Sequence, residues 1–405
     1  MMTFRLAWRN LWRNPRRSVV VLSSLVVGVV AAVVMDTVSR GMVQQVLENQ
    51  IGSHVAHIQI HRKGFHENPE IRSTVPDADK VRKVLTGTPG LRAFSERVVS
   101  FGLLSGAATS SGVSLIGVNP EAEKKITTIS ASITKGRQLS GHPNEILIGE
   151  ALAEKMGVGV GDKLVGMSSA TDGHVGSEMF RVAGLYKTVS SEFDKSFVFA
   201  PLPNIQQVLT LGSEVSEFAI LLDDRERVEE VQSRLKSELG GAYEVLTYAE
   251  ILPILVMQVE VTAQSMVIFY AIIGCALIFG IVNTMLMSVF ERIHEFGVLK
   301  AVGMKDGRLF RMIVLEASLL GILGTVIGFL LGYAIYLWLA KDGLDLSAFS
   351  EGLESWGVGA VVYPLLTWDV LANALIVIPL FAVLGSLYPA YRAVKLEPVK
   401  AMKYV

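Results

Sequence analysis

The sequence predicts an α-helical membrane protein with four transmembrane helices and a large α+β extracytoplasmic domain between helices one and two. Three observations lead to this fold class. The chain has 405 residues, is 51% hydrophobic and has a mean hydropathy of +0.45, which is too apolar for an ordinary soluble protein. Its apolar residues gather in four stretches, each of about the 20 residues that a membrane span needs. The long segment between the first two stretches is mixed in polarity, as in a folded domain.

The four apolar stretches carry one charge in total, Glu316. The first stretch follows a basic segment, which is also typical of a cleaved signal peptide, but its length and the lack of a small-x-small cleavage site favour an uncleaved span. The stretches are residues 18–35, 261–290, 312–340 and 370–391.

The positions of Lys and Arg near the span ends predict the orientation. Basic residues are concentrated before the first span, between the second and third, and after the fourth, whereas 341–369 is mainly acidic. Both termini and the loop at 291–311 are therefore expected in the cytoplasm, and the long segment on the outside.

Three domains are expected: an N-terminal interfacial helix with the first span (1–40), the external α+β domain (41–258), and the remaining spans (259–405). Alternating patterns such as "HVAHIQIH" and "EFAILLDD" predict strands, and "DADKVRKVL" predicts a helix beginning near Asp77. A β-rich middle between two strand–helix units favours two subdomains, one of them built from both ends of the segment. The only cysteine, Cys275, lies in the second span, so no disulfide is expected in this domain.

The N-terminal stretch "FRLAWRNLWRNPRR" predicts a helix lying on the inner leaflet. Tryptophan prefers the headgroup level of a bilayer, and arginine binds the anionic phosphates of the lipids. On a helix, the apolar face holds Phe4, Trp8, Leu11 and Trp12, and the basic face holds Arg5, Arg9, Arg13 and Arg16.

A short charged segment, "ERIHEFGVLKAVGM", separates the second and third spans. Ile293, Phe296, Leu299 and Val302 recur at helical spacing, and Gly303 ends the pattern. The segment, about 291–304, is too polar to span a membrane and too short to be a domain. It has the form of a cytoplasmic docking helix, and composition alone does not separate this interpretation from an ordinary tight loop.

This segment, followed by "LFRMIVLEASLLGILGTVIGFLLG", resembles the permease subunits of the MacB/FtsX/LolC–LolE superfamily of ABC transporters. The ends "AWRNLWRNPRR" and "YPAYRAVKLEPVKAMKYV" match as well, although Phe296 stands where the family usually has Ile. In the external segment, "IGVNPEAEKKIT", "FRVAGLY" and "FDKSFVFAPLPNIQQVL" resemble the lipoprotein-releasing LolC/LolE branch most.

The resemblance implies an inner-membrane permease subunit that transmits ATP-driven motion from a separate ATPase to a periplasmic domain, for lipoprotein release. The alternatives are a MacB-type efflux permease working with an adaptor and an outer-membrane channel, and an FtsX-like regulatory membrane protein. The residues expected to couple to the ATPase are Glu291, Arg292, Glu295, Phe296, Gly297, Leu299, Lys300 and Gly303.

The same resemblance implies the partners: an ABC ATPase dimer, a second permease copy or a related permease, a lipoprotein substrate, a periplasmic carrier and membrane lipids. No nucleic-acid partner is expected. The chain itself is expected to be no enzyme and to hold no cofactor, with ATP and magnesium bound by the partner ATPase. Its nearest approach to a phosphate-binding loop, "GVGVGDKL" (157–164), has Leu164 in place of the required hydroxyl, so we interpret it as a glycine turn.

Several other residues allow more than one interpretation. Gly324, Gly328 and Gly332 form a smooth strip for helix packing, within one chain or between two. Glu316 is expected to form an intramembrane ion pair with Arg308 or Arg292 rather than to relay protons. Four histidines, His54, His57, His61 and His66, are interpreted as surface residues rather than zinc ligands. The stretch "SSATDGHVGSEM" (168–179) is either a carrier-binding loop or a mobile hairpin.

Overall fold

The computed structural model describes residues 7–9, 13, 15–355 and 357–395, and these divide into two compact units. The sheet domain comprises Gln45–Met257 and Leu346–Ala360. The membrane unit comprises the described parts of Met1–Gln44, Gln258–Asp345 and Val361–Val405. Residues 346–360, from the loop before the last span, belong to the sheet domain, which no pattern in the sequence indicates.

The predicted N-terminal interfacial helix is described only in part. Residues 7–9 are helical, and Trp8 and Arg9 are exposed. Phe4, Arg5, Leu11 and Trp12 lie outside the described residues, so the amphipathic pattern remains a prediction.

In the described part of the chain, four helices are long and apolar enough to cross a membrane, at the positions that the sequence predicts. The fourth contains a single π-helical turn, η5, between two α-helical pieces. The helices begin and end as follows: α2, Pro15–Gln50; α10, Pro253–Glu291; α12, Asp306–Asp342; and α14, η5 and α15, Trp368–Ala372, Asn373–Val377 and Ile378–Val394.

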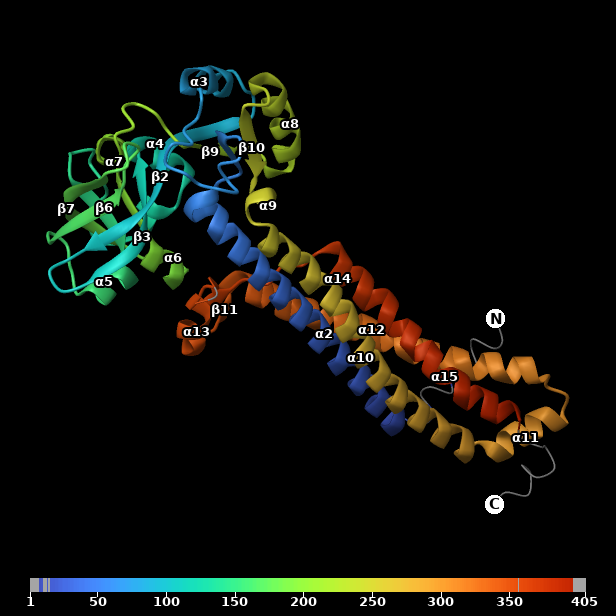
Figure 1. Cartoon of the computed structure of the whole chain (residues 1–405). Coiled ribbons are helices and arrows are strands. Elements are labelled where there is room, and N and C mark those ends of the chain that lie inside the picture. Colours follow the sequence, from blue (N-terminus) through green and yellow to red (C-terminus); the bar gives the residue numbers. More distant parts are fainter. Residues whose placement is uncertain (1–6, 10–12, 14, 356, 396–405) are drawn as a thin grey trace. The chain divides into compact units, whose positions relative to one another are not determined.

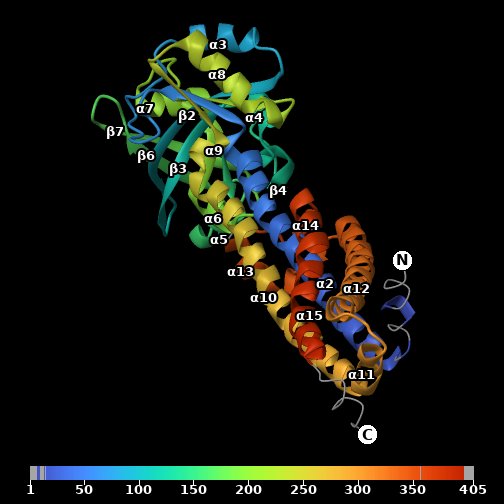
Figure 2. The same ribbon diagram turned by 90° about the vertical axis from the view of Figure 1, so that its right-hand side faces the viewer.

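Inside the membrane unit, apolar side chains of all four spans form one core. Leu25 and Val29 of α2 meet Leu277 of α10, and Ile313 of α12 and Ala390 of α15 belong to the same cluster. Figure 2 shows α12 running beside the fourth span. The remaining apolar side chains of the spans face outward, which in a bilayer means toward lipid.

A ten-stranded sheet, in the order β10-β1-β9-β2-β3-β8-β5-β7-β4, forms the core of the sheet domain (Figure 1). The tenth strand, β6, pairs with both β2 and β7, so β2-β3-β8-β5-β7-β6 closes into a ring. The strands are β1 Ile58–Arg62, β2 Leu91–Ser105, β3 Ser110–Val118, β4 Ile133–Gly136, β5 Glu145–Gly149, β6 Lys163–Ser169, β7 Val175–Tyr186, β8 Phe197–Pro201, β9 Glu217–Leu222 and β10 Tyr243–Thr247.

Strands from both ends of the domain sequence, β1, β9 and β10, lie together beside the first half of β2. This is the arrangement expected for a subdomain built from both ends. The long strand β2 continues into the ring, however, so the two groups share one sheet, and their separation into subdomains remains a prediction. The sequence analysis did not identify β2.

Helices cover this sheet, with α3 and α8 beside β10 and β9 (Figure 1). Asp77 caps α3 as predicted, since its side chain accepts from the Lys80 backbone N–H. The helices of the domain are α3 Ala78–Thr86, α4 Pro120–Ile126, α5 Glu150–Met156, α6 Ser191–Ser196, α7 Leu202–Leu209, α8 Val228–Leu239, α9 Tyr248–Ile251 and α13 Ser350–Ser355.

Candidate coupling site

The short charged segment between the second and third spans forms a separate helix, α11, Ile293–Ala301. Arg292 breaks the helical path after α10, and α12 starts at Asp306. Gly303 turns the chain with φ of +101°, a conformation that L residues rarely adopt, and nothing lies within 4 Å of the place where a Cβ would be. The sequence signal for this turn was therefore conformational rather than steric.

Arg292 ties the start of α11 to the interior of α12. One guanidinium nitrogen lies 3.1 Å from a carboxylate oxygen of Glu316, and both side chains are buried. The guanidinium also lies 4.9 Å from the centre of the Phe296 ring and 3.4 Å from Glu295. The structure thus gives Glu316 the partner Arg292, whereas the alternative partner Arg308 is exposed.

Lys300 ties the end of α11 to α15 and to the start of α12. Its ammonium donates to the carbonyl of Val394, the last residue of α15, at 2.7 Å, and pairs with Asp306 at the start of α12 at 3.0 Å. A cation at a helix C-terminus is favourable because the last carbonyls lack partners within the helix. Arg13 makes an ion pair with Glu295 from the N-terminal side. Three other parts of the chain, α12, α15 and the N-terminal segment, therefore meet at α11.

The apolar face of α11 differs from the predicted one. Ile293 and Phe296 are buried and Leu299 is half-buried against the core of the membrane unit, as expected, but Val302 is 84% exposed. The reason is that α11 ends at Ala301, so Val302 belongs to the turn rather than to the helical face.

The outward face of α11 was missed by the sequence analysis. Val298 is 41% exposed, and His294 and Ala301 are exposed beside it. Of the residues expected to couple, Glu291 and Gly303 are exposed, Glu295 and Lys300 are partly exposed, and Arg292, Phe296 and Gly297 face inward. The helix is thus anchored by its charged and aromatic side chains, and it presents Val298 outward, next to Val302 in the turn that follows.

The glycine strip of α12 packs within the chain. A Cβ on Gly324 would lie 2.7 Å from the Cβ of Leu25, and one on Gly328 would lie 2.7 Å from the Cβ of Val29. A Cβ on Gly332 would lie 3.2 Å from the Cβ of Val33, which belongs to α2 like Leu25 and Val29. The structure therefore assigns this strip to the α2–α12 contact, an alternative that spacing alone left open.

The histidines depart from the prediction of surface positions. His61 is only 2% exposed, and His54 and His57 are half-buried, so only His66 is a surface residue. Among the described residues, no group of three His, Cys, Asp or Glu side chains is placed to hold a metal ion. The stretch 157–164 forms the turn between α5 and β6, with positive φ at Gly157 and Gly161, and its last two residues begin β6.

The stretch 168–179 is a tight β6–β7 hairpin whose strands pair regularly. The register of β2, β6 and β7 forms two rows of neighbouring residues on the outside of the ring. One row is Leu103, Met167 and Ser177, and the other is Ser105, Val165 and Met179. Large apolar side chains are exposed here, among them Phe101 at 60% and Val175 at 71%. We call this uncharged surface the outer apolar face; its residues are Phe101, Leu103, Ser105, Val165, Met167, Ser169, Val175, Ser177 and Met179.

Four spans, a large sheet domain between the first and second, and a short anchored helix between the second and third define a class of multi-pass membrane permeases. Residues 18–238 match the MacB-like periplasmic core domain, and residues 267–398 match the FtsX-like permease C-terminal domain. The chain belongs to the MacB/FtsX/LolC family of ABC transporter permeases.

Its relatives include both branches that the sequence resembles. The lipoprotein-releasing system transmembrane protein LolC of Xylella fastidiosa is 25% identical, over 71% of this chain and 72% of that protein. LolC of Neisseria meningitidis is 24% identical, over 96% of this chain and 94% of that protein. The macrolide export ATP-binding/permease protein MacB of Nitrobacter winogradskyi is 23% identical, over 98% of this chain and 59% of that protein.

Proposed function

We propose that this chain is the permease half-unit of an inner-membrane ABC machine that releases lipoproteins. Two permease chains, identical or related, would assemble with an ATPase dimer that binds ATP and magnesium. Both termini and α11 would lie in the cytoplasm, in keeping with the distribution of Lys and Arg. The similarity to LolC supports lipoprotein as the substrate class.

The anchoring of α11 carries the proposal. A helix tied to α12 through Glu316, to α15 through the Val394 carbonyl and to the N-terminal segment through Arg13 cannot move alone. A push on Val298 of this helix and on Val302 in the following turn would therefore displace the spans together. We propose that the ATPase applies this push and that α2 and α10, which run into the sheet domain, carry the motion to it.

The outer apolar face supports a second part of the proposal, docking of a periplasmic carrier. Contiguous exposed apolar surface on a folded domain marks interaction sites. No member of this face carries a charge, so a partner would be recognised by apolar contact, which suits a carrier of acylated proteins.

The coupling proposal is tested by the double substitution Val298→Glu and Val302→Glu. Charges on the outward face should abolish co-purification of the ATPase from native membranes in mild detergent, while Arg292–Glu316 and the fold are kept. The control is Val160→Glu in the sheet domain, a valine whose exposure of 47% is close to the 41% of Val298.

Mass spectrometry of the wild-type complex discriminates the alternatives. A soluble ABC ATPase with a lipoprotein or a second permease supports release, and an ATPase with an adaptor protein would move the assignment to efflux. Normal ATPase binding by the double variant would show that α11 is not the contact.

A further inference from the structure

The junction between α2 and the sheet is an unusual piece of backbone. After Gln50 the helix continues as a single π turn, η1, Ile51–Val55, and then Ala56 adopts φ of 59° before β1 begins. A non-glycine residue in this conformation costs free energy and persists only where its surroundings hold it. Ala56 is fully buried, so the groups that hold it are inside the sheet domain.

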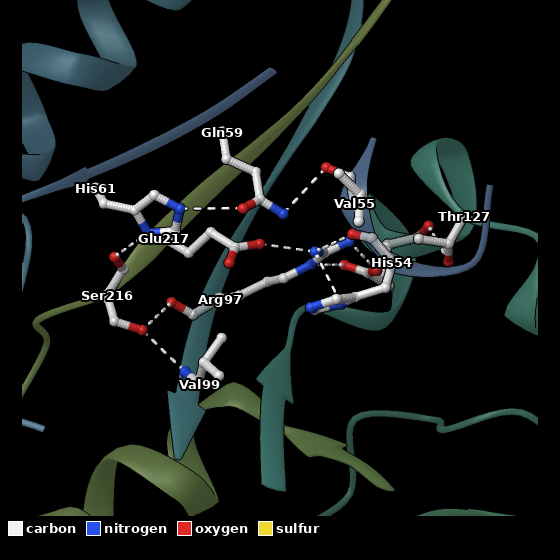
Figure 3. A network of polar contacts seen from close by, with 10 residues as sticks. His54, Val55, Gln59, His61, Arg97, Val99, Thr127, Ser216 and Glu217 are labelled. Atoms are coloured by element: carbon white, nitrogen blue, oxygen red, sulfur yellow. Dashed lines mark hydrogen bonds and ion pairs between the residues drawn. The ribbon is translucent and has the colours of Figure 1, made fainter. Parts of the chain in front are cut away.

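Side chains from the sheet cap the end of this helix. Arg97 of β2 donates to the carbonyl of His54 at 2.6 Å, and Gln59 of β1 donates to the carbonyl of Val55 at 3.0 Å (Figure 3). The last carbonyls of a helix lack partners within the helix. These two hydrogen bonds therefore satisfy carbonyl groups that would otherwise be buried without a hydrogen bond. His61 in turn donates to the Gln59 side-chain oxygen at 3.0 Å.

Arg97 is itself fixed by two carboxylates from two other elements. Its guanidinium donates to both oxygens of Glu123 on α4, at 3.1 and 2.7 Å, and to Glu217 on β9 at 2.7 Å. Arg97 is 0% exposed. Although burial works against its charge, Glu123 and Glu217 raise the pKa of Arg97, so the guanidinium stays protonated.

His54 completes the cluster. Its ring lies against Phe197, and burial together with the Arg97 charge lowers the pKa of His54 to about 4. The imidazole is therefore neutral near pH 7, and its Nδ1, 3.3 Å from an Arg97 nitrogen, can accept from it. Arg97 thus holds both the carbonyl and the ring of one residue in the π turn.

We propose that Arg97 is a positioning residue that locks the end of α2 and η1 to the sheet, so that movement of α2 reaches β1, β2, β9 and α4 instead of being absorbed at Ala56. This inference rests on the proposed function for its transmitting role. A buried ion cluster contributes little net stability, and a fixed geometry is the property it can supply. A planar guanidinium suits this role because it reaches three acceptors at once.

The test compares two matched neutralised variants in the full-length chain. The triple variant combines Arg97→Met with Glu123→Gln and Glu217→Gln. It removes the contacts by which Arg97 holds η1, which we call the clamp, without leaving a buried unpaired charge. Arg82→Met with Glu96→Gln removes another two-oxygen Arg–Glu pair, which joins α3 to β2 through 2.6 Å contacts and does not touch η1. Arg97→Lys keeps the charge but cannot span the three acceptors.

Hydrogen exchange of the amides of residues 51–58 is the first readout. We expect the triple variant to exchange there at least tenfold faster than wild type, Arg97→Lys to be intermediate, and the Arg82 control to stay within twofold. Exchange in β5 should be unchanged in all variants, which shows that the ring remains folded. Wild-type protection at 51–58 in the triple variant would overturn the clamp.

The second readout is the exchange difference between nucleotide-free and ATP-bound complexes with the partner ATPase. The triple variant should still bind the partner ATPase, and that ATPase should still hydrolyse ATP, because α11 is intact; the sheet domain of the variant should lose the nucleotide response. A response equal to wild type would overturn the positioning role. If the sheet domain of the wild-type complex shows no difference in exchange between the nucleotide-free and ATP-bound states, the proposed function is contradicted. Exchange at residues 51–58 would then still decide whether Arg97 holds η1.

Discussion

At the scale of single residues, two buried charge clusters stand out, one in each unit. Arg292–Glu316 and the Arg97 cluster both place arginine where its charge is shielded from water and matched by carboxylate. Glu316 was visible in the sequence as the single charge within a span. Arg97 was not, because an arginine in a strand is ordinarily a solvated residue until its neighbours from other elements are known.

Removing one partner of the Arg292–Glu316 pair should destabilise the membrane unit. Glu316→Gln leaves the buried guanidinium of Arg292 without its buried carboxylate partner, since Glu295 is more distant and more exposed. Breaking a buried pair in this way typically costs about 3–5 kcal/mol. Thermal unfolding in detergent should show a clear fall in Tm, whereas Arg308→Met should behave as wild type. The double substitution Arg292→Met and Glu316→Leu should recover most of the loss, and a loss in the double variant as large as in Glu316→Gln would contradict the pairing.

Three histidines of the sheet domain, His54, His57 and His61, predict how stability depends on pH. The pKa of His54 is about 4 in the folded protein, below its ordinary value of 6.5, because of burial and the Arg97 charge. The unfolded chain therefore binds more protons between those values, and stability is lost as pH falls through this window. Burial lowers the pKa of His57 and His61 also, so their contributions have the same sign.

The effect of His54 is measured by exchange of the β1 and β9 amides between pH 7.5 and pH 4.5. The free energy of opening should fall, and in His54→Gln the fall should be smaller by on the order of 2 kcal/mol. If the free energy of opening has the same pH dependence in His54→Gln as in wild type, the imidazole of His54 is not held neutral by its surroundings.

At the scale of elements, the contact of α2 with α12 depends on small residues. Gly328 approaches the Cβ of Val29 and the backbone carbonyl of Val26, so neither neighbour can move aside easily. Gly328→Ala should cost about 1–3 kcal/mol, because the added methyl group forces the two helices apart.

The matched control for this contact is Gly280→Ala on α10, where an added Cβ meets nothing within 4 Å. Its stability should equal or slightly exceed that of wild type, since alanine favours helix. Thermal unfolding of both variants in the same detergent gives the comparison, and equal Tm values would argue against close packing at Gly328.

At the scale of the whole molecule, the proposed function requires surfaces on both units that partners can reach. The membrane unit exposes Val298 of α11 and Val302 of the following turn, and the sheet domain exposes the outer apolar face. Each surface is built from residues of its own unit.

A photo-crosslinking side chain at Val175 tests the outer apolar face in intact cells. The expected product is an adduct with a soluble lipoprotein carrier, and the same probe at Val160, exposed but outside this face, should give none. An adduct with an adaptor protein would favour efflux, and adducts of equal yield at both positions would show that the face is not a docking site.

The sequence by itself determined the spans, the short helix between the second and third, and most strands, because hydrophobic runs and periodicities are local properties of the chain. It also indicated Glu316, Gly303 and the glycine strip. Only the tertiary structure decided that Arg292 pairs with Glu316, that the glycines face α2, and that His61 is buried. It alone revealed β2 as the strand shared by both parts of the sheet and Arg97 as the cap of the π turn. These features bring together residues far apart in sequence, and long-range contacts leave no periodic trace along the chain.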